Sequence, residues 1–184
     1  MPRASDPPEG TERRSRPRKR ASKVTMRMGI GYDSHRFGPG NAIRLGGISI
    51  PHDHALTGHS DADAVAHAVT DALLGAAGEG DIGSMFPDTD PANRGRDSLE
   101  MLTLAMAYLR DRGWRANNVD VTVIAELPRI APYREAMRDA LAGALNLERA
   151  SVSVKGKTNE GMGWIGRGEG IACIAVATVV PVRS

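Results

Sequence analysis

The order of strand-like and helix-like segments constrains the fold of this chain most. Apolar residues recur at helical spacing over residues 61–77, over residues 97–112, and after LPRIAP, where Met137, Leu141 and Leu145 share one face. Strand-like alternation or β-branched runs occur at 27–32, 42–50, 119–126, 151–158 and 170–180. Because these elements intermix without a strict βαβα repeat, we predict an α+β fold. It would be a two-layer, ferredoxin-like sandwich with helices on one face of a mainly antiparallel sheet.

The composition favours a single globular domain. A chain of 184 residues with 41% hydrophobic content can bury one core, and an aromatic content of 4% makes that core aliphatic. No apolar run approaches the roughly 20 residues of a membrane span, and no apolar segment of a signal peptide opens the chain. We therefore expect a cytoplasmic protein without a membrane partner. The single cysteine, Cys173, cannot form an internal disulfide and is expected to be a buried, inert thiol.

Residues 1–25 differ from the rest of the chain. They hold eight Lys and Arg against three Asp and Glu, with four prolines and little apolar content. We expect a disordered basic tail at 1–25 and a single catalytic domain at 26–184. A nucleic-acid or targeting role for RRSRPRKR is the less favoured alternative to a solvated extension or to a true start at Met26 or Met28.

The segment 57–75, TGHSDADAVAHAVTDALLG, places polar residues along an otherwise small and apolar helix. Asp63, His67 and Asp71 follow one another at i, i+4 and i+8, opposite the apolar face. Acidic residues suit the start of a helix, where they cap amide groups and face the positive end of the dipole. Capping explains the aspartates at the start of the helix but not His59 or His67.

The functional interpretation of this helix is that it contributes a ligand to a metal site. Asp33 and His35 alternate at a strand end, so both side chains face one way, and His67 completes a set of two imidazoles and one carboxylate. Such a set leaves one tetrahedral position open, as in catalytic zinc sites. A hydrogen-bonded strand-end histidine is the ordinary alternative, but all five histidines lie between residues 35 and 67. His52 and His54 are expected to be solvated.

Two phosphate-binding patterns fail on their context. Gly78, Gly80 and Gly83 match G-x-G-x-x-G, but they follow a helix and open a loop. Gly156-Lys157-Thr158 has the end of a P-loop motif without its first glycine, because Ser151 stands there.

Three segments carry a resemblance to a known family. GYDSHRF, LTGHSDADAVAHAVTDALLGAAGEGDIGSMFPDTDP and KTNEGMGWIGRGEGIA resemble the 2-C-methyl-D-erythritol 2,4-cyclodiphosphate synthases of the non-mevalonate isoprenoid pathway, and the likeness extends over 27–181. It implies a lyase that cyclises 4-diphosphocytidyl-2-C-methyl-D-erythritol 2-phosphate and releases CMP. The 2-phosphate would attack the β-phosphorus of the same molecule.

The resemblance also implies the metal-binding and catalytic residues. Asp33, His35 and His67 would bind one Zn²⁺ per subunit, and Glu160 would bind a second ion, Mg²⁺ or Mn²⁺. His59 and Thr158 would stabilise the transition state. Asp63 would orient His67, and Asp71 would be structural.

Two substrate-binding sets follow from the same resemblance. The first, for the erythritol and its phosphates, is Asp33, Ser34, His35, His59, Ser60, Asp81, Ile82, Gly83, Phe86, Pro87, Asp88, Thr89 and Asp90. The second, which includes the cytidine pocket, is Ala125, Glu126, Leu127, Pro128, Arg129, Ile130, Ala131, Lys157, Thr158, Asn159, Glu160, Trp164 and Arg167.

The sequence departs from the family pattern at several of these positions. Glu126 and Arg129 stand where a neutral residue and a lysine are usual, and Lys157 stands where a threonine is common. Arg129 keeps the positive charge but presents a planar fork of donors instead of a point charge. Trp164 replaces phenylalanine and Ala62 replaces glycine, which leaves the chemistry unchanged.

The family pattern implies a homotrimer with active sites between subunits. It places Arg167 and Glu169 along the central channel, whereas the alternative is a glycine-rich turn with a surface ion pair. Two other function classes stay open from the residues alone. A metal-dependent phosphohydrolase would give a linear product, and a zinc-stabilised nucleic-acid-binding module would show salt-dependent affinity without turnover.

Overall fold

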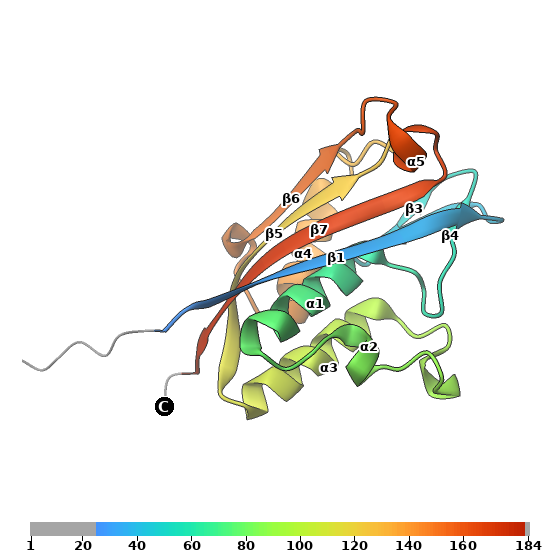
Figure 1. Cartoon of the computed structure of the whole chain (residues 1–184). Coiled ribbons are helices and arrows are strands. Elements are labelled where there is room, and N and C mark those ends of the chain that lie inside the picture. The colour runs from blue at the N-terminus through green and yellow to red at the C-terminus, as the bar shows by residue number, and fades with distance from the viewer. Residues whose placement is uncertain (1–24, 183–184) are drawn as a thin grey trace, which may run out of the picture.

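A five-stranded sheet forms one layer of the protein in the computed structural model, which describes residues 25–182 (Figure 1). The strand order is β4-β1-β7-β5-β6. The β5–β6 pair is parallel and the other neighbouring pairs are antiparallel. The strands are β1 (Arg27–Gly38), β4 (Ala55–Leu56), β5 (Trp114–Ile124), β6 (Val152–Lys157) and β7 (Gly170–Pro181).

Helices pack on one face of this sheet and form the second layer. They are α1 (Ala64–Ala77), α3 (Ser98–Asp111) and α4 (Arg134–Leu145). The short α2 (Ile82–Met85) packs on α1, α5 (Gly163–Gly166) lies in the turn before β7, and 3-10 turns occur at Pro91–Asn93 and Arg149–Ser151. Asp63 caps the start of α1 and Asp97 caps the start of α3. The predicted α+β class is confirmed, while its ferredoxin-like detail stays a prediction.

Two segment predictions need correction. Residues 42–50, expected to be one strand, form the hairpin of β2 (Ala42–Leu45) and β3 (Ile48–Pro51). Gly46 and Gly47 separate the two strands, and both have a positive φ. Tight hairpin turns with two positive φ angles favour glycine, so this pair reverses the chain. The loop expected after the first helix contains α2 and the 3-10 turn at Pro91–Asn93. The predicted disordered tail lies outside the described residues.

Helix α1 approaches strand β1 closely because two strand residues lack side chains. A Cβ atom added to Gly29 would lie 2.1 Å from the Ala72 carbonyl oxygen, and one added to Gly31 would lie 1.9 Å from that of Ala68. The helix backbone therefore rests on the strand backbone. This contact brings His67 of α1 close to Asp33 and His35 of β1.

The core is aliphatic, as the composition predicts, and Cys173 is fully buried in it. Burial raises the pKa of the Cys173 thiol well above its ordinary value, so the thiol is inert. None of the helices between residues 25 and 182 combines the length and hydropathy of a membrane span.

The opposite face of β1 is apolar and uncovered in the single chain. Met28, Ile30 and Tyr32 alternate with the two glycines and are 72%, 69% and 56% exposed. Contiguous exposed apolar side chains of this size are typical of an interaction surface.

Candidate active site

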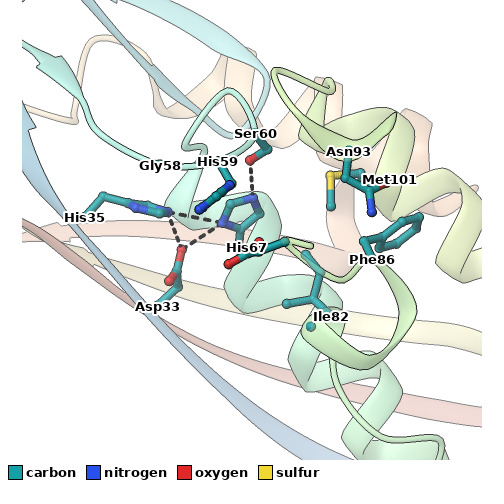
Figure 2. Close-up of a pocket in the computed structure, with 12 residues that line it drawn as sticks. Asp33, His35, Gly58, His59, Ser60, His67, Ile82, Phe86, Asn93 and Met101 are labelled. Carbon is teal, nitrogen blue, oxygen red and sulfur yellow. Dashed lines mark hydrogen bonds and ion pairs between the residues drawn. The ribbon is translucent and has the colours of Figure 1, made fainter. Parts of the chain in front are cut away.

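Asp33, His35 and His67 meet between strand β1 and helix α1. The Asp33 Oδ2 atom lies 3.0 Å from His35 Nε2 and 3.0 Å from His67 Nδ1, and the two ring nitrogens are 3.2 Å apart (Figure 2). The three side chains are only 23%, 15% and 13% exposed. The sequence-predicted triad is therefore assembled by the fold, because the glycines of β1 let α1 come close.

The hydrogen bonds of His35 determine which of its nitrogens carries the proton. His35 Nδ1 lies 3.0 Å from the Thr57 carbonyl oxygen, which can only accept. Nδ1 therefore donates, and the neutral ring presents the bare lone pair of Nε2 to Asp33. Burial opposes protonation, but Asp33 and the Thr57 carbonyl outweigh it and raise the pKa of His35.

His67 is oriented in the same way by two serine hydroxyls. Its Nε2 atom lies 2.9 Å from Ser60 Oγ and 2.9 Å from Ser98 Oγ. The Ser98 hydroxyl donates to the Asp61 carboxylate, so its oxygen can accept the Nε2 proton of His67. The neutral ring then directs the lone pair of Nδ1 toward Asp33 and His35.

Three lone pairs thus converge on one point, and they fit a divalent metal ion. Bonds of about 2.0–2.1 Å to a tetrahedral zinc ion separate two ligand atoms by about 3.3 Å, close to the observed 3.0, 3.0 and 3.2 Å. Within the described residues, these three side chains are the group whose ligand atoms lie close enough to share an ion. Burial alone would raise the pKa of Asp33, but the two imidazoles hold it well below its usual range.

An ion-pair network supports the triad from behind. Arg44 of β2 places its Nε atom 2.9 Å from Asp61 and its Nη2 atom 2.7 Å from Asp97. Asp61 in turn accepts from Ser98, which is buried at the first turn of α3. The orientation of His67 therefore depends on contacts with the β2–β3 hairpin and helix α3.

Two adjoining cavities open beside the triad. The first, of about 270 Å³, contains the triad and six further predicted site residues, which are His59, Ser60, Ile82, Gly83, Phe86 and Asp88. The second, of about 440 Å³, is lined by His59, Asp88, Thr89 and Asp90, together with Gly58, Pro91 and Arg94. His59 and Asp88 line both, so most of the first predicted substrate set lies together.

A third cavity, of about 430 Å³, follows the ends of β5 and β6. It is lined by the predicted Ala125, Glu126, Leu127, Pro128, Arg129, Ile130, Ala131, Lys157 and Thr158, and by Gly156 and Arg134. Gly156 lets Ile130 pack closely against β6, since a Cβ atom at Gly156 would lie only 2.8 Å from Ile130 Cβ.

The sheet register locates the third cavity relative to the triad. Ser34 of β1 pairs with Ala172, Ala172 with Ile124, and Ile124 with Lys157. Both regions therefore lie at one end of the sheet. Three strand spacings separate β1 from β6, or about 14 Å.

Some predicted site residues lie apart from these cavities. Asp81 caps α2, the Pro87 carbonyl accepts from Asn93, and Asn159 and Glu160 lie in the turn after β6. Ser34 and Trp164 line another cavity of about 320 Å³, together with His35 of the triad, Arg36 and Glu169. Of the predicted catalytic pair, Thr158 lines the third cavity, whereas His59 lines the first two.

Three expectations about charged or polar side chains are corrected or resolved. Asp63 does not orient His67, because it accepts from the amides of Gly46, Gly47, Val65 and Ala66. Asp71 is structural, as expected, and accepts from the Ile82 amide at 2.8 Å. His52 and His54 are not merely solvated, since both rings pack near Phe37, with His52 stacked at 4.9 Å.

Arg167 and Glu169 form an exposed ion pair in the turn before β7. In the single chain this agrees with the surface ion pair, which was the alternative to a place along the central channel of a trimer.

The sequence did not reveal Ser98, Asp61 and Arg44 as supports of His67. In the sequence, Asp61 is explained as one of the acidic residues at the start of the first helix, and Ser98 lies 31 positions from His67. The Asp97-Ser98 pair signals a helix start and nothing about a metal site.

Comparisons with known proteins agree with this geometry. A sequence model described as the YgbB family matches residues 26–180. The 2-C-methyl-D-erythritol 2,4-cyclodiphosphate synthase of Gemmatimonas aurantiaca is 62% identical over 161 residues, which cover 88% of this chain and 97% of that protein. The synthase of the same name from Pseudomonas aeruginosa is 50% identical over 155 residues, with 84% and 99% covered.

The solved structures agree as well. The IspF protein of Plasmodium falciparum, in complex with CDP, superposes with a TM-score of 0.75 at 33% identity, covering 88% of this chain and 100% of that one. The family match spans both the triad and the turn after β6. The chain therefore belongs to the YgbB family, together with the 2-C-methyl-D-erythritol 2,4-cyclodiphosphate synthases.

Proposed function

We propose that this enzyme of the non-mevalonate isoprenoid pathway closes its cyclic product at the cavities beside the triad. The substrate is 4-diphosphocytidyl-2-C-methyl-D-erythritol 2-phosphate, whose 2-phosphate attacks the β-phosphorus and displaces CMP. The observation that carries the proposal is the convergence of three lone pairs beside two cavities that share His59 and Asp88. A phosphate dianion is already a nucleophile, so the chain needs to position it and to offset its charge.

Asp33, His35 and His67 would hold a zinc ion, and Glu160 would hold a second divalent ion. When bound, these ions supply Lewis-acid chemistry and neutralise the charge of the phosphates. His59 is exposed at the junction of the two cavities, where its imidazole can donate a hydrogen bond to a phosphate oxygen. Ser60, which contacts His67 Nε2, holds both a ligand ring and the cavity wall in place.

The third cavity suits the cytidine diphosphate part of the substrate. Its walls combine the apolar Leu127 and Ile130 with three cationic side chains, Arg129, Arg134 and Lys157. Cations near the phosphates favour the approach of one anion to another. Thr158 donates to the Glu160 carboxylate at 2.8 Å and is proposed to stabilise the transition state from this side.

A homotrimer would join the two halves of the site. Within one chain the triad and the third cavity lie at one end of the sheet but on different strands, about 14 Å apart across it. A head-to-tail interface that closes into a ring brings different surfaces of neighbouring subunits together. The exposed Met28, Ile30 and Tyr32 provide an apolar surface for such an interface.

Subunit mixing tests this arrangement. Light scattering should report about three chains per particle, the closed ring expected for a heterologous interface. A mixture of His67→Ala and Glu160→Ala subunits should recover activity that neither variant has alone, because hybrid trimers contain intact sites. A fully active monomer would contradict the proposal.

Residues 26–184 are proposed to form the whole catalytic domain and to act in the cytoplasm. The family match begins at residue 26, which supports this boundary. A protein starting at Met26 should keep its melting temperature and turnover. A lower melting temperature would show that residues 1–25 contribute to the fold, and a loss of turnover alone would show that they contribute to catalysis.

The reaction itself is tested by ³¹P NMR with the diphosphocytidyl substrate. The expected products are a cyclic diphosphate and CMP in equal amounts. A linear phosphate product would instead indicate a phosphohydrolase. Unchanged substrate, together with salt-sensitive nucleic-acid binding that is lost with residues 1–25, would indicate a binding module.

A further inference from the structure

The turn after β6 contains a backbone conformation that needs support. Glu160 has a φ of 52° and Gly161 a φ of 74°, and the Met162 amide donates to the Asn159 carbonyl at 2.9 Å to close the turn. Two successive central residues with positive φ favour Gly, Asn or Asp, and a glutamate there is strained. Such strain persists only where the surroundings hold the residue in place, and it points to a functional constraint.

One carboxylate provides that support. The Oε1 atom of Glu126 accepts from the amide of Asn159 at 3.0 Å and from the amide of Gly161 at 3.1 Å. These amides are the ones immediately before and after Glu160. Glu126 therefore holds both ends of the strained residue, and a charged acceptor makes these bonds stronger than neutral ones.

The contact also joins two loops that are distant in the sequence. Glu126 follows β5 and lines the third cavity, whereas residues 158–161 follow β6. The Ala125 amide donates to the Lys157 carbonyl at 2.9 Å, so the two loops start from a paired position. Beyond that pairing, Glu126 fixes where the Glu160 backbone lies, and Thr158 fixes its carboxylate.

We propose that Glu126 is a positioning residue that holds Glu160 in its left-handed turn, and thereby aligns the Glu160 carboxylate with a nucleotide in the third cavity. The inference rests on the proposed function for the part of it that concerns turnover. Its structural part, the hold on the turn, is independent of any substrate. The acceptor oxygen, and not the negative charge alone, is what the turn requires.

Three variants separate these contributions. Glu126→Ala removes the acceptor, and Glu126→Gln keeps an acceptor oxygen at the same position without the charge. Glu148→Ala removes one negative charge from an exposed position that caps no helix with its side chain, and serves as the control. Glu126→Asp, whose carboxylate falls one methylene short of the amides, repeats the test if the alanine variant does not fold.

The first measurement is amide hydrogen exchange in substrate-free protein. Glu126→Ala should speed exchange at Asn159 and Gly161 by about 10- to 100-fold, the effect of losing bonds to a charged acceptor. Glu126→Gln should stay within a few-fold of the wild type, and Glu148→Ala should match it. Unchanged protection in Glu126→Ala, or equal loss in the alanine and glutamine variants, would overturn the proposal.

The second measurement is turnover with the diphosphocytidyl substrate. In Glu126→Ala, kcat should fall about 10- to 100-fold while KM changes less, and Glu126→Gln should restore most of kcat. An alanine variant with normal kcat would overturn the catalytic part. If the wild type formed no cyclic product while the exchange difference held, the proposed function would fail and the hold on the turn would stand.

Discussion

The triad region and the turn region of this enzyme are built by different means. The triad lies on a strand and a helix whose backbones touch, and its side chains are mostly buried. The turn region lies on loops after β5 and β6, where Leu127 is 61% and Met162 64% exposed. One carboxylate, Glu126, holds the strained residue of the turn.

The two regions also differ in how firmly the single chain holds their side chains in place. In the triad, one nitrogen of each imidazole is held by a hydrogen bond to another part of the chain. The other nitrogen of each ring therefore points into the triad. The turn region has a wall and cations but is open to solvent. We therefore expect damage to the triad region to appear in metal binding and stability, and damage to the turn region to appear in turnover.

The largest expected effect tests whether the triad is the metal site. His67→Ala removes one of three protein ligands, so purified protein should contain little zinc, and CMP release should fall by about a thousandfold or more. His54→Ala, at an exposed histidine outside the cavities, is the matched control and should keep both properties. Elemental analysis and a timed CMP assay measure them. Stoichiometric zinc and near-normal turnover in His67→Ala would exclude α1 from the metal site.

The next effect tests the backbone contact that positions the triad. Gly31→Ala places a Cβ atom against the Ala68 carbonyl oxygen, so the free energy of unfolding should fall by roughly 3 kcal/mol and zinc affinity should weaken. Gly75→Ala, in helix α1, would meet no atom within 4 Å, and its free energy of unfolding should rise by about 1 kcal/mol. Urea unfolding compares them. Equal stability of the two variants would mean that the close approach is not needed.

A smaller effect tests the support behind His67. Ser98→Ala removes the hydroxyl that accepts from His67 Nε2, so zinc affinity should fall about 10- to 100-fold while the fold persists. Ser49→Ala, on an exposed position of β3, is the control. Chelator competition gives both affinities. If Ser98→Ala bound zinc like the wild type, Ser60 alone would suffice to orient the ring.

The smallest effect concerns the pH dependence of stability at Asp71. Burial raises the pKa of Asp71 above its ordinary value of 3.8, despite the bond from the Ile82 amide. As pH rises above 3.8, the unfolded chain releases a proton that the folded chain still holds, so this residue makes the protein less stable as pH rises through the raised pKa.

Asp71→Asn keeps an acceptor for the Ile82 amide and removes this titration. The free energy of unfolding of the variant, relative to the wild type, should therefore increase from about pH 4 toward neutral pH and then level off. Urea titrations of both zinc-loaded proteins provide the comparison. A difference that shrinks as pH rises would have the wrong sign and would contradict the assignment.

The sequence predicts the elements and the triad better than the contacts that hold them. Periodicity predicts the helices, and the alternation of Asp33 and His35, together with the histidine of α1, predicts the three side chains that the fold brings together. Asp63 was misassigned because i, i+4 spacing suggests proximity to His67, whereas its side chain turns back to the Gly46 and Gly47 amides. Such long-range partners are set by packing, which a local pattern does not contain.

The same limit applies to the turn region. The family resemblance placed Glu126 in the second substrate-binding set and marked it as a departure from the usual residue, but it did not predict a contact with the turn after β6. Its partners, the Asn159 and Gly161 amides, lie more than 30 positions away and depend on the pairing of β5 with β6. The positive φ of Glu160 also leaves no trace in the sequence, because glutamate does not signal that conformation.

Protons and a metal ion would compete for the three lone pairs that meet at the triad. In the absence of an ion, a shared proton can relieve their mutual repulsion, and the raised pKa of His35 beside Asp33 reflects this tendency. Uptake of the ion must then expel that proton, so metal loading acidifies the surroundings and weakens as acidity increases. A divalent ion at these three ligand atoms would therefore bind less tightly as the pH falls.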